Sequence, residues 1–288
     1  MRLLGTSHAC QRVPGGGLPG AGKAGLLAYP AVEALSELRD LAGRAARRGG
    51  EVIRAVTSAT AELKGAGDYV TEVDRASERA IAQMLLSGTP DVPVLGEEEG
   101  GTAGDRYWVV DPLDGTTNFL HGFPIVGVSV AFVRDGESLA GAVHAPFLGE
   151  TYAAARGHGA VVERPGQKAS ALAVSSRPPA QAVVATGFPF RRKDVLARYL
   201  RTMEACLERF EDLRRPGAAS LDLAWVAAGV FEGFFELGLS PWDVAAGGVL
   251  IQEAGGLVTD WRGGGAWMSG DILAGSPAVH AELLALTT

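Results

Sequence analysis

The spacing of apolar residues predicts two helices in the first third of the chain. From Ala31 onward, apolar side chains recur every three or four residues, which is the period of a helix with one buried face: Leu35, Leu38, Leu41, Ala45 and Ala46. We expect this helix to break at Gly49-Gly50, because glycine is a poor helix former, although Val52, Ile53 and Val56 continue one apolar face beyond the break. A second helix is predicted from Thr71, with apolar residues on one side as far as Leu85.

Short apolar runs farther along the chain predict β-strands. In the first half these are residues 93–95, 107–110, 127–133 and 139–144, and the turn at 134–137 joins the last two as a hairpin. In the second half, strands predicted at 182–186, 233–237, 256–260 and 272–275 alternate with helices predicted at 195–209, 221–230, 244–254 and 277–286. Such alternation is typical of layered proteins in which helices cover sheets.

Segments rich in proline, glycine and polar residues mark where ordered units begin and end. Residues 14–20 read Pro-Gly-Gly-Gly-Leu-Pro-Gly and cannot hold a helix, so we expect residues 1–30 to be a disordered leader. This leader has no apolar stretch of the kind that a secretory signal needs. The polar stretch from Glu163 to Pro179 is the expected boundary between an N-terminal unit, residues 31–178, and a C-terminal unit, residues 179–288.

Composition and charge exclude several classes of protein. The 288 residues are enough for a full core, and a net charge of −7 argues against a nucleic-acid partner. The most apolar stretch, residues 221–239, is interrupted by Asp222, Glu232 and Glu236, so no membrane span is expected. The two cysteines, Cys10 and Cys206, have no metal or redox spacing, which favours a reducing, cytoplasmic location.

Acidic residues interrupt otherwise apolar segments at three places. Glu97–Glu99 follows one predicted strand, Asp111 ends another and precedes Asp114, and Asp243 stands at the start of a predicted helix. Taken singly, these places have plainer explanations: a solvated loop, a turn beginning at Asp114 and a helix cap at Asp243. Asp111 is harder to explain in this way, because a buried carboxylate needs a cation or hydrogen-bond donors.

Taken together, the three places predict a metal site beside a phosphate site. Clustered oxygen ligands suit Mg²⁺, which keeps some of its waters and completes its shell with substrate phosphate. Asp111 and Asp114 are close enough in sequence to face one ion, and the carbonyl of Leu113 can join them. If Gly115 and Thr116 begin a helix, their backbone N–H groups point toward an anion.

These motifs resemble those of the inositol monophosphatase family of Mg²⁺-dependent, lithium-sensitive phosphatases. Residues 111–119, Asp-Pro-Leu-Asp-Gly-Thr-Thr-Asn-Phe, fit the family's first signature at every position, and residues 242–247, Trp-Asp-Val-Ala-Ala-Gly, fit its second. Gly96-Glu97-Glu98 and residues 68–74 also resemble family stretches, and the likeness runs from about Leu35 to the end. It implies an α+β fold, a layered α/β/α/β/α sandwich of two subdomains, and a homodimer.

The resemblance also implies a role for each matching residue. The metal ligands, holding two or three Mg²⁺ ions, would be Glu97, Asp111, Asp114, Asp243 and the carbonyl of Leu113. The catalytic residues would be Glu97, Thr116 and Asp74. Glu97 and Thr116 would orient the attacking water, and Asp74, like Glu98, would lie just outside the metal ligands or contact an outer metal ion. The substrate would be bound by Asp114, Gly115, Thr116, Gly217, Ala218, Ala219, Glu236 and Asp243. Among these, Gly115 and Thr116 would hold the phosphate and Glu236 the substrate hydroxyls.

The activity that the resemblance implies is hydrolysis of a phosphate monoester of a small polyol or sugar, with inositol monophosphate as the first candidate. Fructose-1,6-bisphosphate and histidinol phosphate, which related phosphatases hydrolyse, stay open as alternatives. Some bacterial relatives associate with the transcription machinery, so a non-catalytic, protein-binding role is a further alternative. A complete set of carboxylates would be unnecessary for that role, and its presence favours the enzyme.

Overall fold

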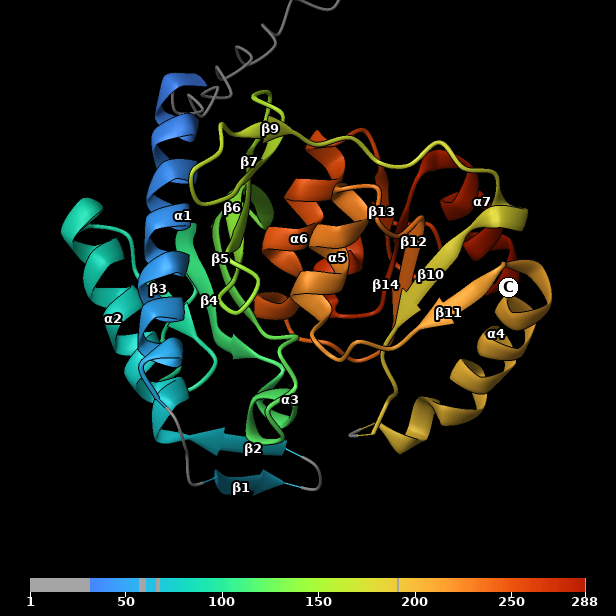
Figure 1. Cartoon of the computed structure of the whole chain (residues 1–288), viewed down its shortest axis with the longest axis horizontal. Helices are drawn as coiled ribbons and strands as arrows, with labels where there is room; N and C mark the ends of the chain where they lie inside the picture. The colour runs from blue at the N-terminus through green and yellow to red at the C-terminus, as the bar shows by residue number, and fades with distance from the viewer. Residues whose placement is uncertain (1–31, 57–60, 66–67, 191, 288) are drawn as a thin grey trace, which may run out of the picture.

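Layers of helices and sheets alternate across the molecule (Figure 1). The computed structural model describes residues 32–56, 61–65, 68–190 and 192–287, so the predicted leader at 1–30 lies outside the described residues. From one side to the other, the layers are helices, a large sheet, helices, a smaller sheet and helices. This order confirms the α/β/α/β/α sandwich expected from the sequence.

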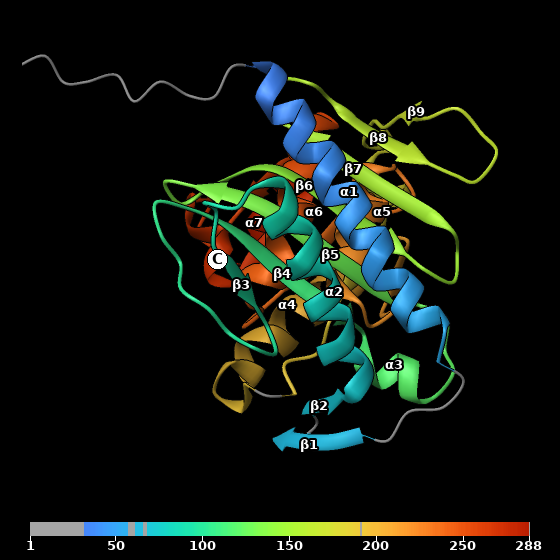
Figure 2. The same cartoon turned by 90° about the vertical axis from the view of Figure 1, so that its left-hand side faces the viewer.

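The larger sheet has seven strands among the described residues, and they lie side by side in chain order: β3 (Val94–Gly96), β4 (Arg106–Asp114), β5 (Gly127–Arg134), β6 (Glu137–Ala145), β7 (Glu150–Ala155), β8 (Ala160–Glu163) and β9 (Ser170–Ala171). β3 is parallel to β4, and the remaining neighbours are antiparallel. Helices α1 (Val32–Arg54) and α2 (Glu72–Gly88) cover its outer face (Figure 2). A hairpin of β1 (Ala61–Gly65) and β2 (Asp68–Thr71) leads into α2.

The smaller sheet is mixed and comes from the second half of the chain. Its strands, in spatial order, are β11 (Asp212–Arg214), β10 (Val183–Thr186), β12 (Gly233–Glu236), β14 (Ile272–Gly275) and β13 (Leu257–Thr259). β14 runs antiparallel to β12 and β13, whereas β10, β11 and β12 are parallel. Helices α4 (Leu196–Arg209) and α7 (Pro277–Leu286) lie on its outer face. Short 3₁₀ turns occur at Pro179–Gln181, Lys193–Val195 and Ala266–Ser269.

The central layer consists of α5 (Ala219–Ala227) and α6 (Pro241–Glu253), which lie between the two sheets. α6 packs on β4–β7 and also contacts β13 and β14, and α5 packs on β12 and β14. Helices that are apolar all round are buried on all sides, and every residue from Val244 to Ile251 is buried. No helix within the described ranges is long and apolar enough to cross a membrane.

The predicted break at Gly49-Gly50 is wrong, because α1 continues to Arg54. Close packing explains the two glycines. A Cβ at Gly49 would lie 2.7 Å from Ser77 Oγ and from Ile81 Cδ1, and one at Gly50 would lie 2.4 Å from the His144 ring. The glycines therefore let α1 approach both α2 and the sheet.

Other boundaries differ less from the expectations. α5 runs from Ala219 to Ala227 rather than over 221–230. The sequence pattern did not predict strands β1, β2, β7, β8, β9 and β11. The hairpin at 134–137 is confirmed, with Asp135 and Gly136 both at positive φ. α7 spans Pro277–Leu286, as expected.

Candidate functional site

Strand β4 brings Asp111 and Asp114 to the edge of the larger sheet. We expected the strand to end at Asp111, but β4 continues to Asp114. Asp111 pairs with Ser129, and Asp114 pairs with Gly127. Two residues of β4, Pro112 and Leu113, therefore lie opposite a single residue of β5, and this mismatch is a β-bulge in β4. Proline has no N–H to give to the ladder, so an irregularity here fits the sequence. Both carboxyl groups are buried, with Asp111 1% and Asp114 8% exposed.

Glu97 and Asp243 reach the same place from other segments. Glu97 follows β3, and its N–H donates to the Val110 carbonyl at 3.1 Å, next to Asp111. Asp243 lies in the first turn of α6, whose start is tied to β5 because Ser129 Oγ donates to the Trp242 carbonyl at 2.8 Å. Ser129 is also the register partner of Asp111. Three distant segments therefore bring acidic residues into the neighbourhood of Asp111.

The electrostatics of Asp111 show that these carboxylates gather around it. Burial raises the pKa of Asp111 well above its ordinary value, and the negative charges of Glu97, Asp114 and Asp243 raise it further. Repulsion of this kind, in a set that offers only oxygen donors, fits a hard divalent cation such as Mg²⁺. Among the residues that the structure describes, no group of three or more His, Cys, Asp or Glu side chains lies close enough together to hold a metal ion.

Hydrogen bonds from the backbone and from serine side chains orient three of the carboxylates. Asp111 Oδ1 accepts from the Leu113 N–H at 3.0 Å. Asp114 Oδ2 accepts from the N–H and the hydroxyl of Ser220, at 2.7 and 2.6 Å. Asp243 Oδ2 accepts from the Ser240 N–H at 2.7 Å. These hydrogen bonds help to fix the orientation of all three carboxylates.

Thr116 and Asp74 form a hydrogen-bonded pair beside the carboxylates. The Thr116 hydroxyl lies 3.1 Å from Asp74 Oδ1 and 3.2 Å from the Leu113 carbonyl oxygen. Asp74 Oδ2 accepts from the N–H of Thr71 at 2.9 Å, which closes the capping box of α2. Burial raises the Asp74 pKa, and the hydrogen bonds from Thr71 and Thr116 oppose that rise. The start of α2 therefore holds Thr116 at a fixed place.

Gly115 joins the first signature to the loop around Gly217. Gly115 has φ 92°, and a Cβ there would lie 3.0 Å from the Ile125 carbonyl oxygen and 3.4 Å from Ala218 Cβ. Asn118 Nδ2 donates to the carbonyls of Ile125 and Pro216, at 2.7 and 2.9 Å, and so tethers the Gly217 loop. Thr116 does begin a helix, but α3 (Thr116–Leu120) has five residues. A helix this short has little dipole, so any binding of an anion here depends on the individual backbone N–H groups.

Glu236 is the last residue of β12, so it comes from the smaller sheet, whereas Asp111 and Asp114 come from the larger one. A Cβ at Gly187 would lie 2.1 Å from Glu236 Oε1, so the glycine makes room for this carboxylate. Burial raises the pKa of Asp222 well above its ordinary value, and Asp114 and Glu236 add to the rise. Glu236 and Asp114 therefore both face Asp222, and Glu236 belongs to the same acidic region as the carboxylates of β4. Ala219 is buried at the start of α5.

Comparison with known proteins identifies the family of this chain. The model of the inositol monophosphatase family matches residues 34–288. The chain belongs to this family. The Nus factor SuhB of Salmonella typhimurium is 41% identical to it over 253 residues, covering 85% of this chain and 93% of SuhB.

Solved structures of family members have the same fold. The extragenic suppressor protein suhB from Bartonella henselae matches with a TM-score of 0.81 and 35% identity, covering 88% of this chain and 98% of that one. The inositol monophosphate-bound form of SaIMPase-II matches with a TM-score of 0.70 and 28% identity, covering 86% of this chain and 92% of that one. The predicted resemblance to the inositol monophosphatase family is thereby confirmed.

Three serines hold the site together, and the family motifs do not include them. Ser129 ties α6 to β5, Ser220 anchors Asp114, and Ser240 is the N-cap of α6. A sequence signal did exist for Ser240, because Ser-Pro-Trp-Asp is a capping box with proline at the first helical position. Ser129 and Ser220 lie in apolar elements, where the sequence gives no sign of a polar role.

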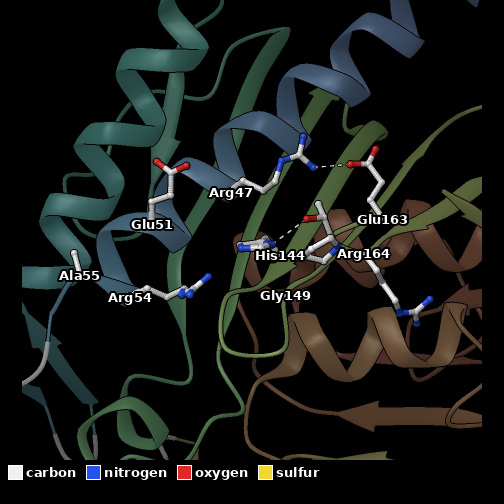
Figure 3. Close-up of a pocket in the computed structure, with 10 residues that line it drawn as sticks. Arg47, Glu51, Arg54, Ala55, His144, Gly149, Glu163 and Arg164 are labelled. Atoms are coloured by element: carbon white, nitrogen blue, oxygen red, sulfur yellow. Dashed lines mark hydrogen bonds and ion pairs between the residues drawn. The ribbon is translucent and has the colours of Figure 1, made fainter. Parts of the chain in front are cut away.

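A ligand-sized pocket also lies away from the carboxylates. It has a volume of about 560 Å³ and lies between the C-terminal half of α1 and the β6–β8 side of the larger sheet (Figure 3). Arg47, Arg54, His144 and Glu163 are among the residues that line it. None of the predicted site residues lines this pocket. The size of a pocket is therefore not enough to locate the carboxylate site in this chain.

Proposed function

We propose that this chain is a Mg²⁺-dependent phosphoric monoester hydrolase and that its preferred substrate is inositol monophosphate. The observation that carries the proposal is the position of Asp111: it is buried at the bulge of β4, and the negative charges of Glu97, Asp114 and Asp243 add to the rise in its pKa. A cluster of this kind destabilises the protein unless a cation occupies it, which makes it a candidate functional site.

The chain's own residues have separate tasks in the proposed reaction. Glu97, Asp111, Asp114, Asp243 and the Leu113 carbonyl would hold the metal. When bound, Mg²⁺ lowers the pKa of water and neutralises charge on the phosphoryl group. Thr116 orients the attacking water. Its hydroxyl hydrogen is directed to Asp74 or the Leu113 carbonyl, and its oxygen can therefore accept a hydrogen bond from water.

The substrate would lie between the first signature and the smaller sheet. The N–H groups of Gly115 and Thr116 would donate to the phosphate oxygens, and the Gly217 loop closes that side of the site. Glu236 would accept hydrogen bonds from hydroxyls of the alcohol, which favours a polyol. The inositol monophosphate bound to SaIMPase-II supports this choice of substrate.

The test is phosphate release from a panel containing inositol 1-phosphate, fructose-1,6-bisphosphate, histidinol phosphate, adenosine 3′,5′-bisphosphate and NADP. We expect turnover with Mg²⁺ that is highest on inositol 1-phosphate, is lost in EDTA and is inhibited by Li⁺. Asp111→Asn should abolish turnover, whereas Asp105→Asn, an exposed aspartate just before β4, should not change it. A folded protein that releases no phosphate from any member of the panel would contradict the proposal.

The relatives support a second candidate function. SuhB of Salmonella typhimurium bears the name of a Nus factor, so we also propose that this chain has a protein-binding role in transcription. The two functions separate in the Asp111→Asn variant. The variant should lose turnover, and a pull-down with the transcription machinery of the same organism should recover it as efficiently as the wild type. Failure of the wild type to co-purify would remove this candidate.

A further inference from the structure

One face of α2 touches the candidate metal site at three places. Asp74, Ser77 and Glu78 are three and four residues apart, so their side chains lie on the same side of the helix. All three are buried, with exposed fractions of 3% or less. Asp74 contacts Thr116, as described above. Ser77 and Glu78 contact the two segments that carry Asp111 and Glu97.

Glu78 holds the loop that contains Glu97. Its two carboxylate oxygens accept from the N–H groups of Glu98 and Glu99, both at 2.8 Å. A Cβ at Gly96 would lie 2.0 Å from Glu78 Oε1, so glycine is needed for the carboxylate to come this close. The loop is closed by a hydrogen bond of 2.9 Å from the Gly96 N–H to the Gly100 carbonyl. Glu78 therefore contacts the backbone on both sides of Glu97.

Ser77 holds the bulge that contains Asp111. Its hydroxyl donates to the Pro112 carbonyl at 2.9 Å, in the peptide that joins Pro112 to Leu113. The bulge interrupts the ladder between β4 and β5, so this bond gives the Pro112 carbonyl a partner from outside the sheet. Gly49 of α1 leaves room for Ser77, as described for the close packing of the two helices.

We infer that Ser77 and Glu78 are positioning residues for the metal site, which hold the Glu97 loop and the Asp111 bulge at a fixed separation. This inference rests on the proposed function. Neither side chain would itself bind the metal or the substrate. Like-charged carboxylates repel one another when the metal is absent, so groups around them must keep them together. α2 does this through hydrogen bonds to backbone atoms, which leaves the ligand side chains unblocked.

The test compares Mg²⁺ binding of the wild type with that of Glu78→Gln and Ser77→Ala, using titration calorimetry on the full chain. The two N–H groups bind different carboxylate oxygens, and glutamine replaces one of these oxygens by an NH₂ group, so one N–H would face a donor instead of an acceptor. We expect the Kd for Mg²⁺ to rise about tenfold or more in each variant. In the phosphatase assay, the Mg²⁺ concentration for half-maximal rate should rise by the same factor, while kcat at saturating Mg²⁺ changes less.

Two substitutions on the same helix serve as matched controls. Glu72→Gln changes an exposed glutamate, and Ser87→Ala removes an exposed hydroxyl that donates to the Gln83 carbonyl. Both should bind Mg²⁺ as the wild type does. If Glu78→Gln does not fold, Ser77→Ala, which removes one hydrogen bond, still decides the question.

The outcomes separate this inference from the proposed function. Wild-type Mg²⁺ affinity in Ser77→Ala and in folded Glu78→Gln would overturn the inference alone. A wild-type protein that binds no Mg²⁺ would overturn both the inference and the proposed function. Weaker binding in the two variants, with unchanged binding in the two controls, would support the inference.

Discussion

Replacing Gly50 by alanine tests whether close packing, rather than helix propensity, explains the glycines of α1. Alanine is the better helix former by about 1 kcal/mol, so propensity alone predicts stabilisation. The new Cβ would, however, lie 2.4 Å from His144 Cδ2 and 3.2 Å from Pro146 Cβ. The His144 ring cannot easily move away, because its Nδ1 lies 3.0 Å from the Glu150 carbonyl oxygen and 2.9 Å from Thr151 Oγ1.

The expected result is a net loss of stability. Overpacking costs about 1–3 kcal/mol, and after subtraction of the propensity gain of about 1 kcal/mol we expect Gly50→Ala to lose up to roughly 2 kcal/mol in free energy of unfolding. For chains of this size that is a fall in Tm of up to roughly 8 °C. The matched control is Gly43→Ala on the same helix, where the nearest atom to a new Cβ is 3.8 Å away. Gly43→Ala should gain up to about 1 kcal/mol.

Both variants are measured by urea unfolding followed by circular dichroism. Opposite signs for the two substitutions would support the packing explanation. If Gly50→Ala stabilises the protein as much as Gly43→Ala does, then helix propensity outweighs the contact with His144 and the explanation is wrong.

Three further predictions concern buried polar groups. Burial lowers the pKa of His144 to about 4. Because the unfolded chain binds this proton near pH 6.5, stability should fall by roughly 3 kcal/mol as pH drops from 6.5 to 4, and NMR should show a neutral ring at pH 5. Burial raises the pKa of the Cys206 thiol to about 12, so in a Cys10→Ser variant Ellman's reagent should react only after urea is added. Ser220→Ala removes one of the two hydrogen bonds that Ser220 donates to Asp114, and it should weaken Mg²⁺ binding about tenfold. An unchanged Kd for Mg²⁺ in titration calorimetry would contradict this.

The sequence predicts the parts of this molecule that depend on local pattern. Helix α7 and the hairpin at 134–137 follow from apolar periodicity and turn residues, which act within a few positions of one another. The grouping of Asp111 and Asp114 is likewise local. The layered fold follows from the resemblance between signatures and could be stated before any contact was known.

The features that depend on contacts between distant segments could not be predicted in this way. The glycines at 49 and 50 look like a helix break until Ser77, Ile81 and His144 are seen beside them. β4 continues past Asp111 because β5 pairs with it on both sides of the bulge. The hydrogen bond from Ser220 to Asp114 joins residues 106 positions apart, and no spacing in the sequence indicates it.

The central helix layer has a consequence for synthesis on the ribosome. The larger sheet is complete at Ala171, whereas α5 begins at Ala219 and α6 at Pro241. As the chain emerges, α1 and α2 are available to cover the outer face of that sheet. The inner face, with Val109, Ala131 and Val143, has no cover until the later helices have been translated. Bare apolar sheet surface associates with other chains, so the last third of the chain determines when a newly made molecule is protected from aggregation.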